Sequence, residues 1–299
     1  MAPPDTAAHL LKTGVAALKQ GGQFDDVEID ARTLLAIALG KTPNALLLDL
    51  ETTVSPTVVA GFLTMIEKRV AGMPVSRIIG RRAFWDHEFT IDTATLDPRA
   101  DTETLVAHAL AILTQPSAPP TPRILDLGTG TGCILISLLA ELPGATGTGT
   151  DISPKALAVA RTNAAAAGVA SQAAFHQSDW FTNVTGSFDM IVSNPPYIPH
   201  DDIATLMPEV RLHDPRVALD GGADGLDAYR SIIAGAPSHL ERGWLICEAG
   251  IDQAADIGDL MQQAGLRKPD GVAAIFEDLA GIPRSVAGFI SAWQSVSAI

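Results

Sequence analysis

The segment Ser193-Asn194-Pro195-Pro196-Tyr197 places an amide, two prolines and a phenol directly after an apolar run that is typical of a buried strand. The two prolines remove two backbone donors and fix two φ angles, so they stiffen the segment. The side-chain oxygen of Asn194 and the main-chain carbonyl of Pro195 can accept two N–H bonds from one planar group, and Tyr197 can pack on its face. A polar strand end with a Pro-Pro stop is the plainer interpretation of the same residues.

A second stretch that can hold a ligand is the glycine loop Asp126-Leu127-Gly128-Thr129-Gly130-Thr131-Gly132, between a strand candidate and a helix candidate. Glycines let the backbone pass close to a ligand, and N–H groups at a helix start favour polar or anionic atoms. The dinucleotide fingerprint G-x-G-x-x-G fails because Cys133 takes its last position. A tight turn between strand and helix is the alternative reading of this loop.

Two acidic positions follow the next two strand candidates. Asp151 ends the run TGTGTD, where a carboxylate can accept both hydroxyls of a ribose. Asp179 and Trp180 come after the third strand candidate and pair an acid with an aromatic ring. Each feature alone is weak, and two acidic loop residues are the plainer interpretation, but together the three sites favour a nucleoside-containing ligand.

The pattern D-x-G-x-G-x-G resembles the cofactor loop of the S-adenosylmethionine methyltransferases. This resemblance implies S-adenosyl-L-methionine as the methyl donor and S-adenosyl-L-homocysteine as the product. It implies that Asp126 faces the methionine part of the ligand and that Asp179 and Trp180 lie where the adenine is read. The candidate cofactor-binding residues are therefore Asp126, Gly128, Thr129, Gly130, Thr131, Gly132, Asp151, Asp179, Trp180 and Asn194.

Methyltransferases with [NDS]-PP-[YFW] at the fourth strand end act on planar sp² nitrogen, which is a poor nucleophile because its lone pair is delocalised. Two acceptors must hold its N–H bonds so that the lone pair turns toward the methyl group. Holding donor and acceptor in line supplies much of the rate. No strong base is needed, since an alkylated amide cation is acidic enough to lose its proton to water. The candidate catalytic and substrate-binding residues are Asn194, Pro195, Pro196 and Tyr197.

The rest of the chain is organised to position these loops. Residues 1–74 predict a small N-terminal helical domain, with helices over about 29–39 and from Ser55-Pro56 to Ala71-Gly72. In a methyltransferase that acts on a protein, this domain would serve substrate recognition. Residues 75–98 predict a β-hairpin connector. From residue 99 to 299, after a helix over Thr102–Leu113 with Asp101 as its cap, strand and helix candidates alternate, which predicts an α/β, doubly wound, mostly parallel sheet.

With these residues in place, the chain resembles the HemK/PrmC family of protein-glutamine N5-methyltransferases nearly end to end. The resemblance is carried by DARTLLAIALG, PVSRIIGRRAFW, PRADTETLV, DLGTGTGCI, SNPPYIP, DPRVALDGGADGLDAYR and DLAGIPR. It implies a seven-stranded class I, Rossmann-like methyltransferase sheet and transfer of a methyl group to the glutamine of a Gly-Gly-Gln tripeptide in peptide chain release factors. The family usually has PRPDTE where this chain has PRADTE, and Arg99 in that stretch is a further candidate for substrate binding.

Charge and composition limit the partners. The net charge of −14 divides into +1 for residues 1–82 and −15 for residues 83–299, so the second part is unsuited to wrapping a nucleic-acid duplex. No run of apolar residues is long enough for a membrane span. Two cysteines 114 residues apart and scattered histidines predict neither disulfide nor metal site, and they favour the cytoplasm.

Three alternatives stay open. A glutamine of a ribosomal protein is the nearest rival substrate, and adenine N6 in DNA or RNA can use the same NPPY geometry. A nicotinamide-dependent oxidoreductase or a non-catalytic nucleotide-binding module leaves SNPPY unexplained. The chain's own Gly21-Gly22-Gln23 suggests self-methylation, but a loop between two helices is the better interpretation.

Overall fold

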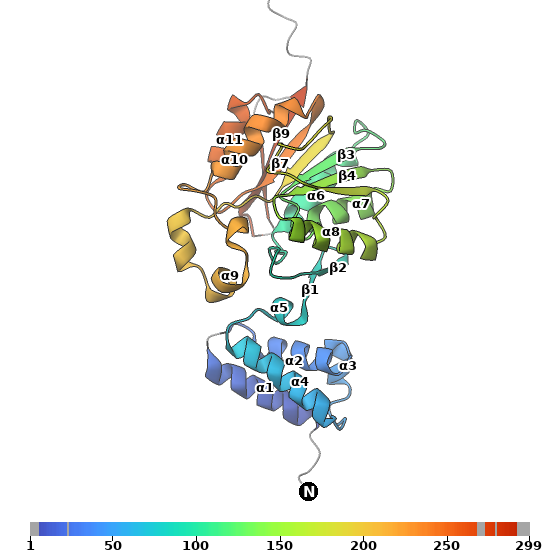
Figure 1. Ribbon diagram of the computed structural model, residues 1–299, viewed down its shortest axis with the longest axis vertical. Coiled ribbons are helices and arrows are strands. Elements are labelled where there is room, and N and C mark those ends of the chain that lie inside the picture. Colours follow the sequence, from blue (N-terminus) through green and yellow to red (C-terminus); the bar gives the residue numbers. More distant parts are fainter. Residues whose placement is uncertain (1–5, 23, 268–272, 279, 292–299) are drawn as a thin grey trace, which may run out of the picture. The chain divides into compact units, whose positions relative to one another are not determined.

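The computed structural model describes residues 6–22, 24–267, 273–278 and 280–291 (Figure 1). The chain divides into two compact units. The helical unit comprises residues 1–81 together with residues 207–213, and the catalytic unit comprises residues 82–206 and 214–299. Within the described part, no helix is both long and apolar enough to cross a membrane, and no cluster of His, Cys, Asp and Glu could hold a metal ion.

The helical unit is built from α1 (Ala7–Gly21), α2 (Val27–Ala38), α3 (Pro43–Leu47), α4 (Pro56–Val70) and α5 (Val75–Ile79). Its core contains Leu10, Leu18, Leu34, Leu35, Phe62 and Ile66. The two helices expected from the sequence are confirmed. Ser55 caps α4 by accepting a hydrogen bond from the N–H of Val58, and Gly72, with φ of 90°, follows its end.

A distant segment completes this unit. The short helix α9 (Pro208–His213) belongs to the helical unit, although it follows the NPPY segment in the chain. The guanidinium of Arg69 is buried and pairs with Asp30 at 2.7 Å and with Glu209. One cation thus joins α4, α2 and α9, which sequence patterns did not indicate.

The catalytic unit contains a seven-stranded sheet in the order β5-β4-β3-β6-β7-β9-β8. Its strands are β3 (Arg123–Leu127), β4 (Thr146–Asp151), β5 (Ala173–Gln177), β6 (Met190–Ser193), β7 (Arg242–Glu248), β8 (Ala274–Glu277) and β9 (Pro283–Ser291). The first five strands in this order pair in parallel, while β9 is antiparallel to β7 and to β8. The predicted seven-stranded, mostly parallel sheet is confirmed.

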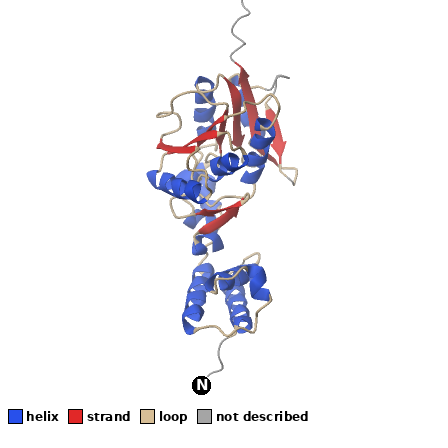
Figure 2. Ribbon diagram, turned by 90° about the vertical axis from the view of Figure 1, so that its right-hand side faces the viewer, coloured by secondary structure: helices blue, strands red, loops and turns tan. Residues whose placement is uncertain are grey.

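Helices cover both faces of this sheet (Figure 2). One core joins the sheet to α6 (Thr102–Leu113), α7 (Cys133–Glu141) and α8 (Pro154–Ala166). The other joins it to α10 (Asp227–Gly235) and α11 (Ala254–Gln263). Successive residues of β3 alternate between them, since Ile124 belongs to the first core and Leu125 to the second. Because β5, β4, β3, β6 and β7 run in parallel, their carboxyl ends lie at one edge of the sheet.

The hairpin consists of β1 (Arg81–Phe84) and β2 (His87–Thr90). The expectation of β structure from residue 75 was wrong for residues 75–79, which form α5, because Gly80 with φ of 71° lets the chain turn from that helix into the strand. Glu103 accepts a hydrogen bond from the N–H of Trp85 at 2.8 Å. Asn163 on α8 exchanges two hydrogen bonds with the backbone of Thr90, so the hairpin is fastened to the catalytic unit.

Two smaller expectations concern Asp101 and the segment Gly21-Gly22-Gln23. Asp101 stands at the start of α6, but its side chain makes no capping hydrogen bond and pairs instead with Arg284 at 2.8 Å. The capping role was therefore wrong. Gly21 and Gly22 end α1, as a loop between helices requires, whereas Gln23 lies outside the described residues.

Replacing Arg69 with Met should release α9 from the helical unit. The thioether keeps the apolar stem but leaves Asp30 and Glu209 without their cation, at a cost of about 2 kcal/mol in local stability because Glu209 is partly exposed. Hydrogen exchange should then accelerate at the amides of residues 208–213 by more than about tenfold. Lys19→Met, which removes the exposed pair with Glu28, is the control, and equal protection in both variants would contradict this anchoring.

Candidate active site

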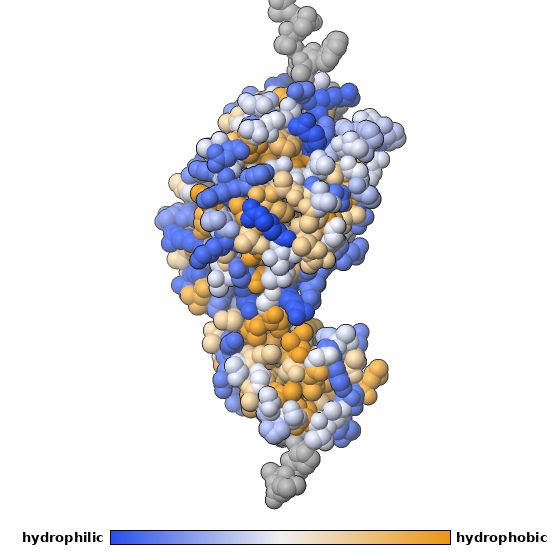
Figure 3. All heavy atoms as spheres, turned by 45° about the vertical axis from the view of Figure 1, so that its right-hand side comes forward, coloured by the Kyte–Doolittle hydropathy of each residue, from blue (hydrophilic) through white to orange (hydrophobic). Residues whose placement is uncertain are grey.

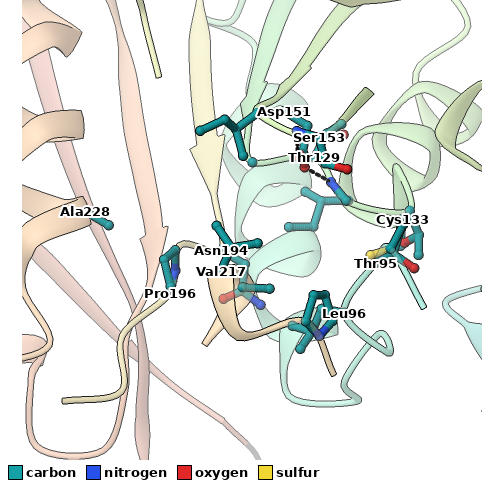
Figure 4. A pocket seen from close by; sticks show the side chains of 18 of the residues that line it. Thr95, Leu96, Thr129, Cys133, Asp151, Ser153, Asn194, Pro196, Val217 and Ala228 are labelled. Carbon is teal, nitrogen blue, oxygen red and sulfur yellow. Dashed lines mark hydrogen bonds between the residues drawn. The ribbon is translucent and has the colours of Figure 1, made fainter. Parts of the chain in front are cut away.

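A cavity of about 360 Å³ opens at the carboxyl ends of β3, β4 and β6. This volume lies within the roughly 300–1,000 Å³ typical of small-molecule sites. Residues of the glycine loop, the β4 end, the β5 end, the NPPY segment and α10 line it. Figure 4 shows Asp151, Ser153 and Thr129 grouped on one side and Asn194 with Pro196 on another. All lining residues belong to the catalytic unit.

The glycine loop needs its glycines for conformation. Gly128, Gly130 and Gly132 have φ values of 71°, 55° and 82°, in the left-handed region. At Gly132 a Cβ would also lie 2.7 Å from Ile136 and 3.3 Å from Ala160, whereas at Gly130 no such crowding exists. Gly128, Thr129, Gly130 and Thr131 line the cavity, and Gly132 supports the start of α7 behind them.

Asp151 lies on the cavity wall, as expected for a ribose-binding acid. One carboxylate oxygen accepts the N–H of Gly130 at 2.9 Å and the other accepts that of Ser153 at 2.8 Å. Burial raises the pKa of this carboxyl, and the two N–H donors oppose the rise. Each oxygen keeps a second lone pair, so the carboxylate is fixed in orientation and can still accept two hydroxyls.

Asp126, unlike Asp151, does not lie on the cavity wall. Its carboxyl is fully buried, is not among the cavity-lining groups, and accepts a hydrogen bond from the Thr129 hydroxyl at 2.6 Å. Burial raises the pKa of Asp126 to about 7. The geometry thus gives Asp126 a hold on the glycine loop, and the contact that the resemblance implies with the methionine part of the ligand stays a prediction.

Asp179 and Trp180 form a further part of the wall. Trp180 has φ of 45°, which is rare for a residue with a side chain, and Ser178 stabilises this turn by donating to its carbonyl at 2.8 Å. A Cβ on Gly128 would stand 3.8 Å from the Trp180 ring. The strained turn therefore brings the indole beside the glycine loop, where an adenine can pack against it.

The NPPY segment contributes Asn194 and Pro196 to the cavity, whereas Pro195 is buried and Tyr197 packs on the α10 and α11 core. Asn194 donates from Nδ2 to the Thr102 hydroxyl at 3.0 Å, which leaves Oδ1 as its free acceptor. Within the described residues, the Pro195 carbonyl accepts no backbone hydrogen bond. Asn194 Oδ1 is thus left to accept beside the cavity, while the acceptor role of the buried Pro195 carbonyl and the packing of Tyr197 on a substrate stay predictions.

Glycines and an amide hold this segment from behind. Gln253 donates to the Tyr197 carbonyl at 3.0 Å. A Cβ on Gly225 would come within 2.3 Å of the same carbonyl, and one on Gly250 within 2.9 Å of the Tyr197 ring. The motif DGLDAYR, notable in the sequence without an assigned role, supplies Gly225 and so permits the close approach that fixes Tyr197.

Arg99 lines the cavity and pairs with Asp214 at 2.5 Å. Asp214 is buried and also accepts a hydrogen bond from the N–H of Asp97. Arg99 therefore holds the start of the segment that follows α9, and its expected contact with substrate stays a prediction.

Sequence reasoning missed two residues, Thr102 and Glu248. Thr102 lies on the cavity wall at the start of α6, and Glu248 ends β7 with only 2% of its surface exposed. Burial raises the pKa of Glu248 to about 7. The available signal was the acid at the end of the apolar run GWLIC, since strand ends form the active edge of such sheets.

Comparisons with known proteins agree with this geometry. Residues 106–221 match the Methyltransferase small domain family, and residues 9–80 match the PrmC N-terminal domain family. The chain is 45% identical to the release factor glutamine methyltransferase of Cereibacter sphaeroides over 96% of this chain and 99% of that protein. It is 48% identical to the protein of the same name from Rhodospirillum rubrum over 86% of this chain and 78% of that protein.

Among solved structures, the hMettl16 catalytic domain in complex with MAT2A 3'UTR hairpin 6 has a TM-score of 0.55 and 16% identity, and the match covers 100% of this chain and 96% of that chain. This likeness concerns the fold alone. The fold and the site together define a class I methyltransferase that depends on S-adenosylmethionine. The chain belongs to the release factor glutamine methyltransferase family, known as HemK/PrmC.

The residues present suit the cofactor. Open backbone at Gly130, a fixed carboxylate at Asp151 and an indole at Trp180 offer surfaces for an amino-acid chain, a ribose and a purine in turn. We propose that these three positions, with Gly128, Thr129 and Asp179, hold S-adenosylmethionine.

Gly130→Ala should weaken binding of S-adenosylmethionine by about tenfold or more, because its methyl group intrudes beside the cavity. Gly168→Ala is a matched control, since Gly168 also has a left-handed φ, of 76°, has open space around it and lies outside the cavity. Both variants bear similar backbone strain, so only the first should lose affinity in calorimetric titration. Equal affinities would refute the assignment of the glycine loop.

Proposed function

We propose that this protein transfers a methyl group from S-adenosyl-L-methionine to the side-chain nitrogen, N5, of the glutamine in the Gly-Gly-Gln motif of peptide chain release factors. The observation that carries the proposal is the Asn194 amide on the cavity wall, with Oδ1 left to accept, in a chain whose full-length relatives carry the name release factor glutamine methyltransferase.

The chemistry follows from the acceptors. A glutamine amide has two N–H bonds, and Asn194 Oδ1 and the Pro195 carbonyl can receive one each. So held, the nitrogen turns its weak lone pair toward the cavity, where S-adenosylmethionine supplies the methyl group and becomes S-adenosylhomocysteine. The methylated nitrogen then gives up one proton to water. Positioning, with no strong base, supplies the rate.

The helical unit is the part that we assign to recognition of the protein substrate. It exposes the apolar side chains of Ile29, Ile37, Leu47, Leu48 and Leu63. On the face shown in Figure 3, hydrophobic residues gather over this unit, at the bottom of the view. Such exposed apolar surface is common at protein–protein contacts.

The rival substrates have less support. A nucleic-acid substrate meets a catalytic part with a balance of −15, which repels phosphates. A ribosomal-protein glutamine is chemically equivalent at the cavity, but no relative described above carries that name. The buried free thiols of Cys133 and Cys247 suit a reducing compartment, and we place the reaction in the cytoplasm.

Labelled S-adenosylmethionine discriminates among these substrates. The protein is incubated with the label and, in parallel, with a release factor, the same factor with its motif glutamine changed to alanine, a ribosomal-protein fraction and nucleic acid. Label should appear on the intact release factor alone, and peptide mass spectrometry should locate it on the motif glutamine. Label on nucleic acid or on the ribosomal fraction alone would overturn the proposal.

Asn194→Ala should lower kcat by about a hundredfold or more while leaving the Kd for S-adenosylmethionine nearly unchanged, because one acceptor for the amide is lost. Asn183→Ala removes an exposed asparagine from a neighbouring loop and should keep the wild-type rate. Single-turnover kinetics separates the methyl transfer from product release. A wild-type rate in Asn194→Ala would refute the role of Asn194 as acceptor.

A further inference from the structure

Glu248 is a buried acid at the end of β7. The proposed reaction does not explain why an acid lies at this position beside the site. Within the described residues its Oε2 atom has no hydrogen-bond partner and no ion pair to this carboxyl is found. A buried carboxyl without full pairing is costly to the fold. A role that compensates for this cost must therefore involve the side chains around Glu248.

Thr102 stands between Glu248 and Asn194. Thr102 is 2% exposed, and its hydroxyl accepts a hydrogen bond from Asn194 Nδ2 at 3.0 Å. A hydroxyl that accepts still has its own proton to donate. Among the described residues, the Oε2 atom of Glu248 lacks a donor at the end of β7, the strand that α6 contacts, and the neighbouring Thr102 and Asn194 side chains both oppose the rise of the Glu248 pKa.

We propose that Glu248, acting through Thr102, is a positioning residue that sets the orientation of the Asn194 side-chain amide. The inference rests on the proposed function, because Asn194 is the substrate acceptor there. It assigns a role to the threonine of PRADTE, the stretch in which Arg99 and Glu103 are occupied by other contacts.

Orientation matters because an asparagine amide has a donor end and an acceptor end of nearly equal shape. If Oδ1 faced Glu248, two acceptors would meet in a buried site and repel each other. The carboxylate therefore selects the orientation in which Nδ2 points to Thr102. That choice leaves Oδ1 to receive an N–H of the substrate, whereas the reversed amide would present an N–H to another N–H.

A direct role for Glu248 as a general base does not fit its position. Thr102 and Asn194 line the cavity, but Glu248 does not. A group that cannot reach the reacting nitrogen cannot take its proton. Its effect on the reaction must pass through the two side chains that touch the cavity.

Five titratable groups on other elements face the Glu248 carboxyl. These are Asp101, Arg284, Tyr197, Tyr229 and Cys133. Arg284 pairs with Asp101 at 2.8 Å and with Asp278 at 3.1 Å, so its charge is shared away from Glu248. The Tyr229 hydroxyl donates to the main-chain carbonyl of Glu248 at 2.8 Å and so does not occupy the carboxyl.

The first test removes the link. Thr102→Val keeps the shape but deletes the hydroxyl, so kcat should fall by about tenfold or more while the Kd for S-adenosylmethionine changes by less than about threefold. Thr102→Ser restores the hydroxyl and should recover most of kcat. Ser137→Ala is the matched control. It removes a buried hydroxyl that lies outside the site and that has no hydrogen-bond partner among the described residues. Equal kcat in the valine and serine variants would overturn the proposal.

The second test changes the acid. Glu248→Gln should lower kcat by about tenfold and should also abolish a rise of kcat between about pH 6 and about pH 8 that the wild type shows as the carboxyl ionises. The same variant should unfold at a higher temperature than the wild type at about pH 8, because it no longer buries a charge. A stabilised variant with the wild-type kcat and pH profile would show a structural role only and would refute the inference. Asp126 remains in the variant, so a persisting pH limb would belong to Asp126 and would also count against Glu248.

A third measurement does not need a methyl acceptor. The side-chain NH₂ resonance of Asn194, identified by its loss in Asn194→Ala, should shift with pH in the wild type and should lose that shift in Glu248→Gln and in Thr102→Val. If the wild type failed to label release factor but kept this shift, the proposed substrate would fall and the coupling would stand. A resonance insensitive to pH in the wild type would overturn the coupling itself.

Discussion

The active site depends on one amide whose two ends must not be exchanged. Asn194 uses its nitrogen to donate to Thr102 and thereby turns its oxygen toward the cavity. The proposed reaction needs two acceptors for one planar nitrogen. Only one orientation of Asn194 can supply the first of them, and we propose that the Pro195 carbonyl supplies the second from the main chain. The prolines fix that carbonyl through the backbone, but nothing in the backbone fixes a side-chain amide. We assign this role to Thr102, at the start of α6, since that helix packs against β7, the strand that ends at Glu248.

A second layer of contacts makes the segment rigid without touching a ligand. Gln253 binds the Tyr197 carbonyl, and no side chain would fit at Gly225 beside that carbonyl or at Gly250 beside the Tyr197 ring. The same principle holds at the other wall of the cavity, where Asp126 binds Thr129 and Asn163 binds the Thr131 carbonyl. Loops that must hold a donor and an acceptor in line are each fastened to a helix or strand, which is the arrangement that catalysis by positioning requires.

Local patterns were sufficient for the sheet, the glycine loop and the NPPY segment, because apolar runs, glycine spacing and adjacent prolines act within a few residues. They failed where a residue's role depends on a partner far along the chain. Thr102 and Asn194 are 92 positions apart, and Glu248 reads as the polar end of an ordinary strand until α6 is placed against it. Asp126 ends its strand as Asp151 does, yet the loop above it folds so that only Asp151 reaches the cavity. The anchoring of α9 by Arg69 likewise joins segments 140 positions apart, and no local signal marks it.

The two buried acids, Asp126 and Glu248, lower the stability of the fold in favour of function. The pKa values of Asp126 and Glu248 rise from 3.8 and 4.5 to about 7 on folding, so the folded chain binds more protons than the unfolded chain between these values. Their contribution to stability is therefore greatest below about pH 4 and is lost as the pH rises through about 7. A fold selected for stability alone would place apolar residues at both positions. Asp126 instead holds Thr129 on the cavity wall through a hydrogen bond, and we assign to Glu248 the corresponding role through Thr102. The same burial that destabilises the carboxylates makes their hydrogen bonds strong, because little water competes for the donors.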